Sequence, residues 1–231
     1  CPSTLCDNLY NMKIIGIAGG SGSGKTTFAK KVISQIDEEK VNILHMDSYY
    51  LPEQPIQNYT KSGKPNFDHP EAFDWELLRT HLTSLQNGDS IEVPIYNFKT
   101  SDRESGSVTV NPKPVLLFEG IFTLIDPVIR ELLDIKTFLH VEADIRFTRR
   151  LNRDVGERGR SLDSVTKQYY ETVRPMYERF LAPQKQYADF IVGEETDVAA
   201  TILAARIKEY INEANSFQHI ISSVSQSELH N

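Results

Sequence analysis

The chain has 231 residues, of which 39% are hydrophobic and 25% charged, as is typical of a soluble protein with one large α/β domain or two small ones. The net charge of −7 argues against a general nucleic-acid-binding protein, so any phosphate-binding surface must be a local basic patch. Cys1 and Cys6 make neither a disulfide framework nor a zinc site, and no apolar run approaches the ~20 residues of a membrane helix. We therefore expect a cytoplasmic protein that binds neither nucleic acid nor membranes.

The most informative stretch is GGSGSGKT at residues 19–26, which fits the phosphate-binding pattern G-x-x-x-x-G-K-[ST]. The apolar run 13–18 before it predicts a buried strand, and the spacing of apolar side chains over 25–36 predicts a helix. In this context the glycines let backbone N–H groups face phosphate oxygens at a helix N-terminus. Lys25 would reach the β- and γ-phosphates, and the Thr26 hydroxyl would bind Mg²⁺. The alternative is a flexible Gly/Ser turn with a surface lysine. We therefore expect nucleoside triphosphate binding, with the phosphate acceptor left open.

The rest of the chain alternates between strand-like apolar runs and segments with helical spacing. Further strands are predicted at 41–46, 114–118, 137–141 and 187–192. Helices are predicted between an N-cap at Asp74 and a stop at Gly88, and at 126–133, 144–160, 161–180 and 196–211. Five strands alternating with helices predict an α/β fold whose parallel sheet is covered by helices on both faces. A β-hairpin at about 91–110, with strands at 91–98 and 108–110, would stand outside that sheet.

The ends of the chain fall outside this alternation. Residues 13–213 are predicted to form one domain, with 1–12 and 214–231 as terminal extensions and Met12 as a candidate natural start. The second extension is polar, but four of its apolar residues fit a helical stripe: Phe217, Ile220, Ile221 and Val224. This segment is either a docking or oligomer helix or a frayed extension of the last helix.

Two acidic residues follow predicted strands. Asp47 comes directly after the strand 41–46, and Glu119 follows the apolar run 114–118. Ligands of open parallel sheets bind beyond the carboxyl ends of the strands, where the loop 19–26 also lies. Asp47 could take a proton from an acceptor hydroxyl, and Glu119 stands where phosphate-loop proteins hold Mg²⁺. Each acid alone could equally be a solvated loop residue.

Six arginines lie within fifteen residues of this acidic chain: Arg146, Arg149, Arg150, Arg153, Arg158 and Arg160. A guanidinium offers a planar fork of donors to phosphate oxygens and stays charged. Such a cluster is typical of a mobile lid that closes over a transferring phosphoryl group. Alternatively, some of these arginines pair with acids on a solvated helix face. Because Gly159 interrupts the helix between Arg158 and Arg160, we expect a lid.

Several motifs together resemble the uridine kinase (uridine–cytidine kinase) family of P-loop nucleoside kinases. In chain order they are GGSGSGKTT at 19–27, DSYY at 47–50, NFDHPEAFD at 66–74, PIYNF at 94–98, LFEGI at 117–121, RRLNRDVGERGRS at 149–161 and YAD at 187–189. The resemblance covers roughly residues 13 to 213. It implies a P-loop kinase fold, ATP as phosphate donor, Mg²⁺, a pyrimidine nucleoside phosphorylated on its 5′-hydroxyl, and assembly into a homotetramer.

The resemblance also implies roles for individual residues. The catalytic residues would be Lys25, Asp47, Arg158 and Arg160, and the Mg²⁺ ligands would be Thr26, Asp47 and Glu119. ATP would contact Gly19, Gly20, Ser21, Gly22, Ser23, Gly24, Lys25, Thr26, Thr27 and Asp197. The nucleoside would contact Tyr50, Asp68, Tyr96, Ser101, Arg150, Arg160 and Gln168. Asp68 would bind the ribose hydroxyls, although it could also cap the helix that begins at Pro70.

One position departs from the family pattern Y-x-[FY]-x-x-H-[ST]-R. This chain has YNFKTSDR at 96–103, so Ser101 stands where the family histidine touches the base. Base selectivity is therefore left open. The alternatives are a related kinase with another acceptor, such as phosphoribulokinase, and a nucleotide-dependent regulator that is not a catalyst. The GTPase tetrapeptide N-K-x-D and the ABC-type motif L-S-G-G-Q are both absent from the sequence.

Overall fold

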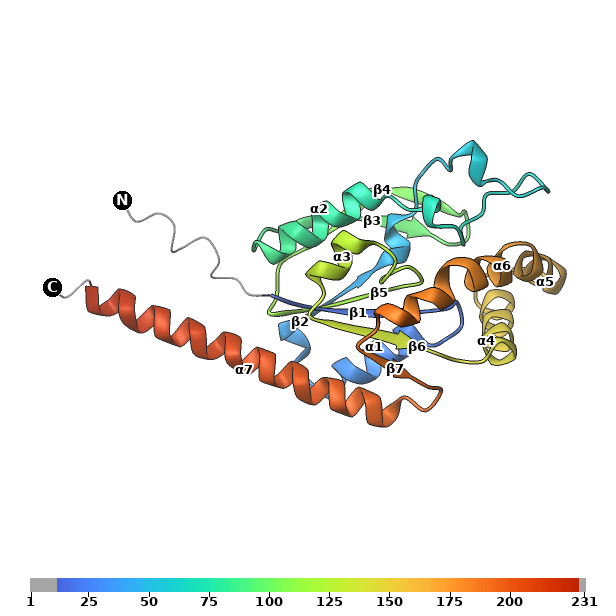
Figure 1. Ribbon diagram of the computed structural model, residues 1–231. Coiled ribbons are helices and arrows are strands. Elements are labelled where there is room, and N and C mark those ends of the chain that lie inside the picture. Colours follow the sequence, from blue (N-terminus) through green and yellow to red (C-terminus); the bar gives the residue numbers. More distant parts are fainter. Residues whose placement is uncertain (1–11, 229–231) are drawn as a thin grey trace.

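The computed structural model describes residues 12–228 of the chain and the side chains of residues 12–216. Both cysteines and the apolar stripe predicted for the C-terminal extension therefore lie outside the described residues or side chains. Within the described part, the fold is built on one central sheet and a separate hairpin (Figure 1).

The central sheet has five strands in the order β2-β5-β1-β6-β7, and every pair is parallel. The strands are β1 (Lys13–Gly19), β2 (Val41–His45), β5 (Val115–Gly120), β6 (Ile135–Leu139) and β7 (Phe190–Val192). β1 and β5 are almost wholly buried, as expected for parallel strands covered on both faces. The predicted α/β fold with a five-stranded parallel sheet is confirmed.

Helices cover the two faces of this sheet. On one face, α1 (Lys25–Ile33) and α7 (Asp197–Glu228) pack against Ile15 and Ile17 of β1. On the other face lie α2 (Trp75–Gln86) and α3 (Pro127–Leu132), against a core that includes Ile14 and Ala18. Figure 1 shows these two layers above and below the sheet. Alternating side chains of a strand point to opposite faces, so the single run 13–18 supplies both cores.

Helix ends agree with the capping residues in the sequence. The carboxylate of Asp74 accepts a hydrogen bond from the backbone N–H of Leu77 at 3.2 Å and so caps α2. Asp126 caps α3 in the same way through Ile129, at 2.9 Å. The C-terminal ends of α1 and α7 differ from prediction. α1 stops at Ile33, short of residue 36, and α7 continues past the predicted end at 211 as far as Glu228.

The hairpin consists of β3 (Ile91–Asn97) and β4 (Asp102–Val110), paired antiparallel. The prediction of a hairpin is therefore right, but β4 begins six residues earlier than the predicted 108. Most side chains of β4 are exposed and polar, so its sequence (DRESGSVTV) carries little of the apolar alternation that identifies a strand. Backbone pairing with β3 forms this strand despite its composition.

The arginine-rich region forms α4 (Ala143–Gly156), and Gly159 follows it with a φ of 68°. That left-handed conformation suits glycine and ends the helix before the predicted residue 160. The predicted helix 161–180 is not a single regular helix. It consists of α5 (Leu162–Gln168), α6 (Arg174–Met176) and two π-helical turns, Tyr169–Val173 and Tyr177–Leu181. Pro175 has no N–H to donate, which disfavours regular α-helical bonding there.

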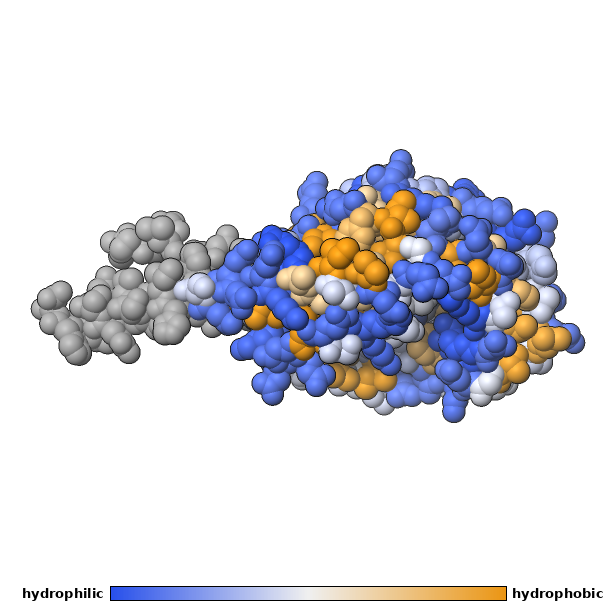
Figure 2. Space-filling model, turned by 90° about the horizontal axis from the view of Figure 1, so that it is seen from below, coloured by the Kyte–Doolittle hydropathy of each residue, from blue (hydrophilic) through white to orange (hydrophobic). Residues whose placement is uncertain are grey.

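The face of the molecule covered by α7 carries apolar patches among polar side chains (Figure 2). The most exposed apolar side chains of β7 and α7 are Ile191, Val198 and Ile202. Within residues 12–228, no helix has both the length and the apolar character needed to cross a membrane.

The buried pair Tyr49–His81 predicts how stability depends on pH. The Tyr49 hydroxyl lies 2.9 Å from Nδ1 of His81, and burial lowers the pKa of His81 below its ordinary 6.5. As the pH falls through 6.5, this histidine takes up a proton in the unfolded chain before it does so in the folded chain. Protonation of His81 therefore favours unfolding as the pH falls. We expect the wild type to lose more unfolding free energy than His81→Gln between about pH 7.5 and about pH 5.5, as measured by urea unfolding. An equal loss in both proteins would contradict this contribution of His81.

Candidate active site

A cavity of about 580 Å³ opens beyond the carboxyl ends of β1, β2 and β5. Its walls come from the phosphate loop, the loop after β2 and the hairpin. Another wall is the arginine-rich segment made of α4 and the residues after it up to Arg160, which we call the lid. Of the predicted site residues, those lining it are Ser21, Gly22, Lys25, Thr26, Asp47, Tyr50, Asp68, Tyr96, Ser101, Glu119, Arg150, Arg158, Arg160 and Gln168. Segments that are distant in the sequence therefore meet at one place, as the strand-end argument predicts.

The phosphate loop joins β1 to α1, and its backbone is pressed against the lid helix. Gly22 has a φ of 80°, and a Cβ atom there would lie 2.3 Å from the carbonyl oxygen of Arg146. The Lys25 ammonium donates to the carbonyl of Gly20 at 3.3 Å. Burial lowers the pKa of Lys25, while the charges of Glu119 and Asp47 oppose that effect. The amine thus lies between the loop and the two carboxylates, where it can meet phosphate oxygens.

The two predicted acids lie beside Lys25. Oε1 of Glu119 accepts a hydrogen bond from the Thr26 hydroxyl at 2.7 Å and lies 2.7 Å from Nδ1 of His45. Burial alone would raise the pKa of Glu119, but the hydrogen bond with His45 and the charge of Lys25 lower it below its usual range. Burial, followed by the charge of Glu119, raises the pKa of Asp47. Glu119 is therefore held ionised, and Asp47 is made more basic.

These oxygens also suit a magnesium ion. Within the described residues, no three His, Cys, Asp or Glu side chains form a group that could hold a metal by itself. Mg²⁺, however, usually takes only one or two carboxylates and completes its shell with water and phosphate oxygens. Two neighbouring carboxylates, of which Glu119 disfavours the charge of Asp47, fit that requirement together with the Thr26 hydroxyl.

The opposite end of the cavity is organised around Asp68, which is 8% exposed. Its Oδ2 accepts a hydrogen bond from Thr172 at 2.9 Å, and its Oδ1 lies 3.9 Å from a guanidinium nitrogen of Arg150. The short 3₁₀ turn at Pro70 is capped by the side chain of His69 and not by Asp68. The alternative capping role for Asp68 is therefore wrong, and its carboxylate faces the cavity.

Aromatic rings form the wall beside Asp68. The ring of Tyr50 stacks on Phe73 at a centroid distance of 4.3 Å and lies 5.0 Å from the ring of Tyr96. Burial and the charge of Asp47 raise the pKa of Tyr96 to about 12, and a hydrogen bond with the Ser101 side chain opposes that rise. Ser101 has a φ of 58° in the turn between β3 and β4. Tyr96 and Ser101 thus present a flat apolar surface and a hydroxyl to the same space.

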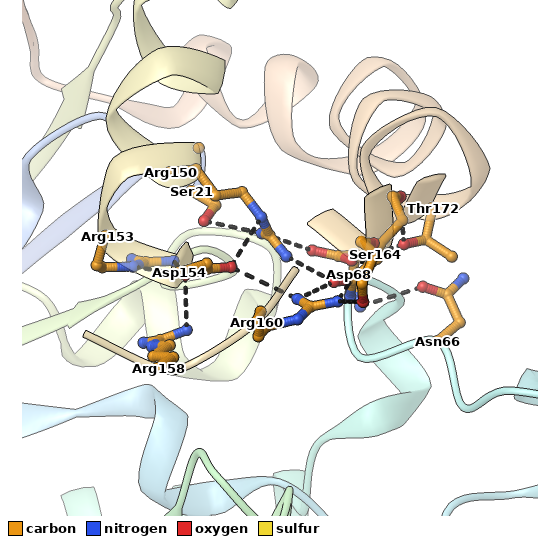
Figure 3. A network of polar contacts seen from close by, with 12 residues as sticks. Ser21, Asn66, Asp68, Arg150, Arg153, Asp154, Arg158, Arg160, Ser164 and Thr172 are labelled. Atoms are coloured by element: carbon orange, nitrogen blue, oxygen red, sulfur yellow. Dashed lines mark hydrogen bonds and ion pairs between the residues drawn. The ribbon is translucent and has the colours of Figure 1, made fainter. Parts of the chain in front are cut away.

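Arginines of α4 and of the segment after it line the cavity near Ser21 of the phosphate loop (Figure 3). Arg150 donates to the Ser21 hydroxyl and to the side-chain amide oxygen (Oε1) of Gln168, each at 3.0 Å. Arg160 also donates to Gln168, and Arg158 stacks over the ring of Phe98 at 4.1 Å. Arg149, in contrast, pairs with Glu194 at 2.7 Å, and both side chains are over 40% exposed. Only part of the arginine cluster therefore belongs to the site, and Arg149 lies on the solvated face.

Asp197 lies outside this cavity, beside the helix that follows the phosphate loop. It lies at the start of α7, its side chain is 79% exposed, and it pairs with Lys31 of α1 at 2.6 Å. It is not among the residues that line the cavity. Gly19, Gly20, Ser23, Gly24 and Thr27 belong to the phosphate loop and the start of α1 but do not line the cavity either.

Three residues of the site were missed at the level of sequence. His45 bonds Glu119, Thr172 bonds Asp68, and Asp154 contacts several lid arginines. His45 lies two residues before Asp47, at the end of a predicted strand, and this position could have identified it as a residue of the site. Thr172 and Asp154 lie on helices, and no local pattern distinguishes them from other polar helix residues.

A parallel sheet with a glycine-rich loop at the end of its central strand, a lysine, two strand-end acids and an arginine lid defines a P-loop kinase. A solved D-glycerate 3-kinase from Cryptococcus neoformans shares this fold, with a TM-score of 0.55 at 18% identity over 80% of this chain and 87% of that one. The profile of the phosphoribulokinase / uridine kinase family matches residues 14–200, and the chain belongs to this family.

Individual relatives are more similar still. A uridine kinase of Lactobacillus helveticus is 46% identical over 203 residues, which are 87% of this chain and 96% of the relative. A uridine kinase of Clostridium botulinum (strain Kyoto / Type A2) is 45% identical over 202 residues, again 87% of this chain and 98% of the relative. The family membership implied by the sequence motifs is therefore confirmed.

The contact between the phosphate loop and Arg146 predicts a difference between two glycine variants. Gly22→Ala and Gly24→Ala both force alanine into a left-handed conformation, which costs about 1–2 kcal/mol. A Cβ atom at Gly24 meets nothing within 4 Å, whereas at Gly22 it collides with the backbone of Arg146. We expect Gly22→Ala to lose clearly more unfolding free energy than Gly24→Ala in urea unfolding without nucleotide. Equal losses would show that the lid helix does not press on the loop.

Proposed function

We propose that this protein is a uridine–cytidine kinase, which transfers the γ-phosphoryl group of ATP to the 5′-hydroxyl of uridine or cytidine. The observation that carries the proposal is that one cavity is lined both by the phosphate loop and by Asp68, Tyr50 and Tyr96. The names of the relatives support the same substrate class. The products would be ADP and UMP or CMP, as in pyrimidine salvage.

Asp47 is the proposed general base. Its raised pKa makes it a better proton acceptor than an ordinary aspartate, and it lies near Lys25. The 5′-oxygen forms the new bond to the γ-phosphorus, the bond from that phosphorus to the β,γ-bridging oxygen breaks, and the hydroxyl proton passes to Asp47. ADP leaves with the electron pair of the broken bond.

Positive charge around the transferring group comes from Lys25, Arg158 and Arg160. These side chains approach the cavity from the loop and from the lid, so they can neutralise charge on the phosphoryl oxygens from two sides. Thr26, Asp47 and Glu119 would hold Mg²⁺, which when bound neutralises phosphate charge and fixes the phosphate geometry. Because Glu119 is held ionised by His45 and Thr26, it remains available as a ligand.

The proposed acceptor is recognised by complementary polar groups. The two ribose hydroxyls can both donate to the carboxylate of Asp68. The guanidinium of Arg150, which lies 3.9 Å from that carboxylate, balances its negative charge. Tyr96 packs beside the pyrimidine ring, and Gln168 and Arg160 complete the polar wall. We also propose that the enzyme is cytoplasmic and assembles into a homotetramer. Asp197 would contact the adenosine side of ATP.

Two other functions remain as outcomes of the test. A phosphoribulokinase would need basic groups for a sugar phosphate and no aromatic wall beside Asp68. A regulator without catalysis would bind nucleotide and transfer nothing. The decisive assay measures ATP consumption with uridine, cytidine, a purine nucleoside, ribulose 5-phosphate and water alone as acceptors. Consumption that depends on uridine or cytidine supports the proposal, and consumption driven by another acceptor or by none contradicts it.

The base role of Asp47 predicts the behaviour of Asp47→Asn. This change keeps the shape of the side chain and removes its charge. We expect kcat to fall by roughly two or more orders of magnitude, with a much smaller change in nucleoside binding. Steady-state kinetics and calorimetric nucleoside titration measure the two effects separately. If nucleoside affinity fell while kcat held, Asp47 would be a binding residue and not the base.

The position of Ser101 predicts altered selectivity in Ser101→His. The serine hydroxyl is much shorter than a histidine ring and would meet the pyrimidine edge only through a bridging water or a local backbone shift. The loss of one hydrogen bond costs about 0.5–1.5 kcal/mol, or up to roughly tenfold in affinity. Histidine tolerates the left-handed backbone at residue 101 better than most side chains. We expect Ser101→His to raise kcat/KM for uridine or cytidine, measured beside a purine nucleoside. Three unchanged values would mean that residue 101 does not face the base.

A further inference from the structure

A single carboxylate lies at the centre of the lid arginines. Asp154 is 0% exposed, and four guanidiniums surround it (Figure 3). The nearest is Arg153, with two nitrogens at 2.9 Å from Oδ1. The others are Arg158 at 3.4 Å, and Arg150 and Arg160 at 3.5 Å each. The backbone also closes on this residue, because the N–H of Arg160 donates to the carbonyl of Asp154 at 3.0 Å.

The spacing of these residues explains the geometry. Arg150 lies one helical turn before Asp154 on α4. Arg158 lies four residues after Asp154, just beyond the end of that helix at Gly156, and still reaches it. Arg160 reaches it because the chain reverses at Gly159, where the positive φ brings the segment after α4 back toward the helix. One carboxylate thus fixes arginines that come from the helix and from the segment beyond it.

The charges in this cluster do not balance. Four guanidiniums face Asp154, and the other acids near them in the described part of the chain are Asp68, at 3.9 Å from Arg150, and Asp47, whose charge acts on Arg158. A fully buried carboxylate between several arginines holds each of them in place, since moving one would weaken its ion pair. The remaining positive charge points into the cavity beside the phosphate loop, through Arg150, which bonds Ser21.

We propose that Asp154 is a positioning residue that holds the lid arginines in the geometry needed for phosphoryl transfer, while itself touching neither substrate. This inference rests on the proposed kinase function and adds a requirement to it. The attraction of the lid for phosphates comes from the arginines, and their alignment comes from Asp154. The two contributions are therefore separable: removal of the carboxylate leaves every positive charge in place but releases the constraint on where each one lies.

The test compares Asp154→Asn with the matched control Glu194→Gln. Glu194 pairs with Arg149 of the same helix at 2.7 Å, but on the exposed side and away from the cavity. Each protein is measured for kcat, for the KM of ATP and of uridine, and for calorimetric binding of inorganic tripolyphosphate. Hydrogen exchange of residues 150–161 without nucleotide reports how firmly the lid is held.

For Asp154→Asn we expect kcat to fall by roughly tenfold to a hundredfold, because misplacement by about 1 Å can cost 10²-fold. Tripolyphosphate should bind as tightly as to the wild type or more tightly, since a negative charge near the anion has been removed. Exchange over 150–161 should become faster. Glu194→Gln should change none of these quantities by more than about twofold, as expected for an exposed ion pair.

Two results would overturn the inference. One is a kcat for Asp154→Asn within about threefold of wild type. The other is a loss of tripolyphosphate affinity in parallel with kcat, which would mean that Asp154 supports only the folding of the lid.

A second variant covers the case in which Asp154→Asn does not fold. Asp154→Glu keeps the charge and moves it by one methylene, and we again expect kcat to fall while tripolyphosphate affinity is kept. A wild type that binds tripolyphosphate but phosphorylates no nucleoside would instead refute the proposed function.

Discussion

The register of β2 against β5 is the constraint on which the site depends. His45 lies opposite Glu119 in this parallel pair, and Glu119 in turn lies opposite Ile17 of β1, just before the phosphate loop. The register is fixed by apolar side chains that fill both faces of β5. A slip of one residue would turn each of these side chains to the wrong face of the sheet. The position of the acid beside the loop is thus a consequence of core packing.

That position has an electrostatic cost, which the neighbouring groups offset. Buried charge is unfavourable unless it is paired and hydrogen-bonded. Glu119 receives bonds from His45 and Thr26 and lies near Lys25, whereas Asp47 has less compensation and a raised pKa. Burial lowers the pKa of Lys25, and the charges of Glu119 and Asp47 offset that effect only in part. Each group is thus incompletely neutralised without ligands, so anionic phosphates and a divalent cation together would complete the charge balance of this part of the cavity.

Much of this arrangement could be predicted from the sequence, because its determinants are local. The phosphate loop is a contiguous motif between a strand and a helix, and Asp47 and Glu119 are identified by the strands they follow. The exposed strand β4 lacks apolar alternation, and its pairing with β3 is a tertiary effect. Asp154 could be foreseen only as one more acid on a helix, since its contacts depend on how the chain reverses after α4.

Arg150 shows why the two ends of the cavity act as one site. Its guanidinium bonds Ser21 of the phosphate loop and Gln168 at the acceptor end, and it lies 3.9 Å from Asp68. Its remaining nitrogen, Nε, faces the buried Asp154 at 3.5 Å. A side chain with four such neighbours cannot shift toward one without leaving another, because its planar fork fixes the directions of its donors. One planar guanidinium therefore links the phosphate loop to Asp68, the acid that would hold the ribose, while Thr172 holds that acid from its other oxygen.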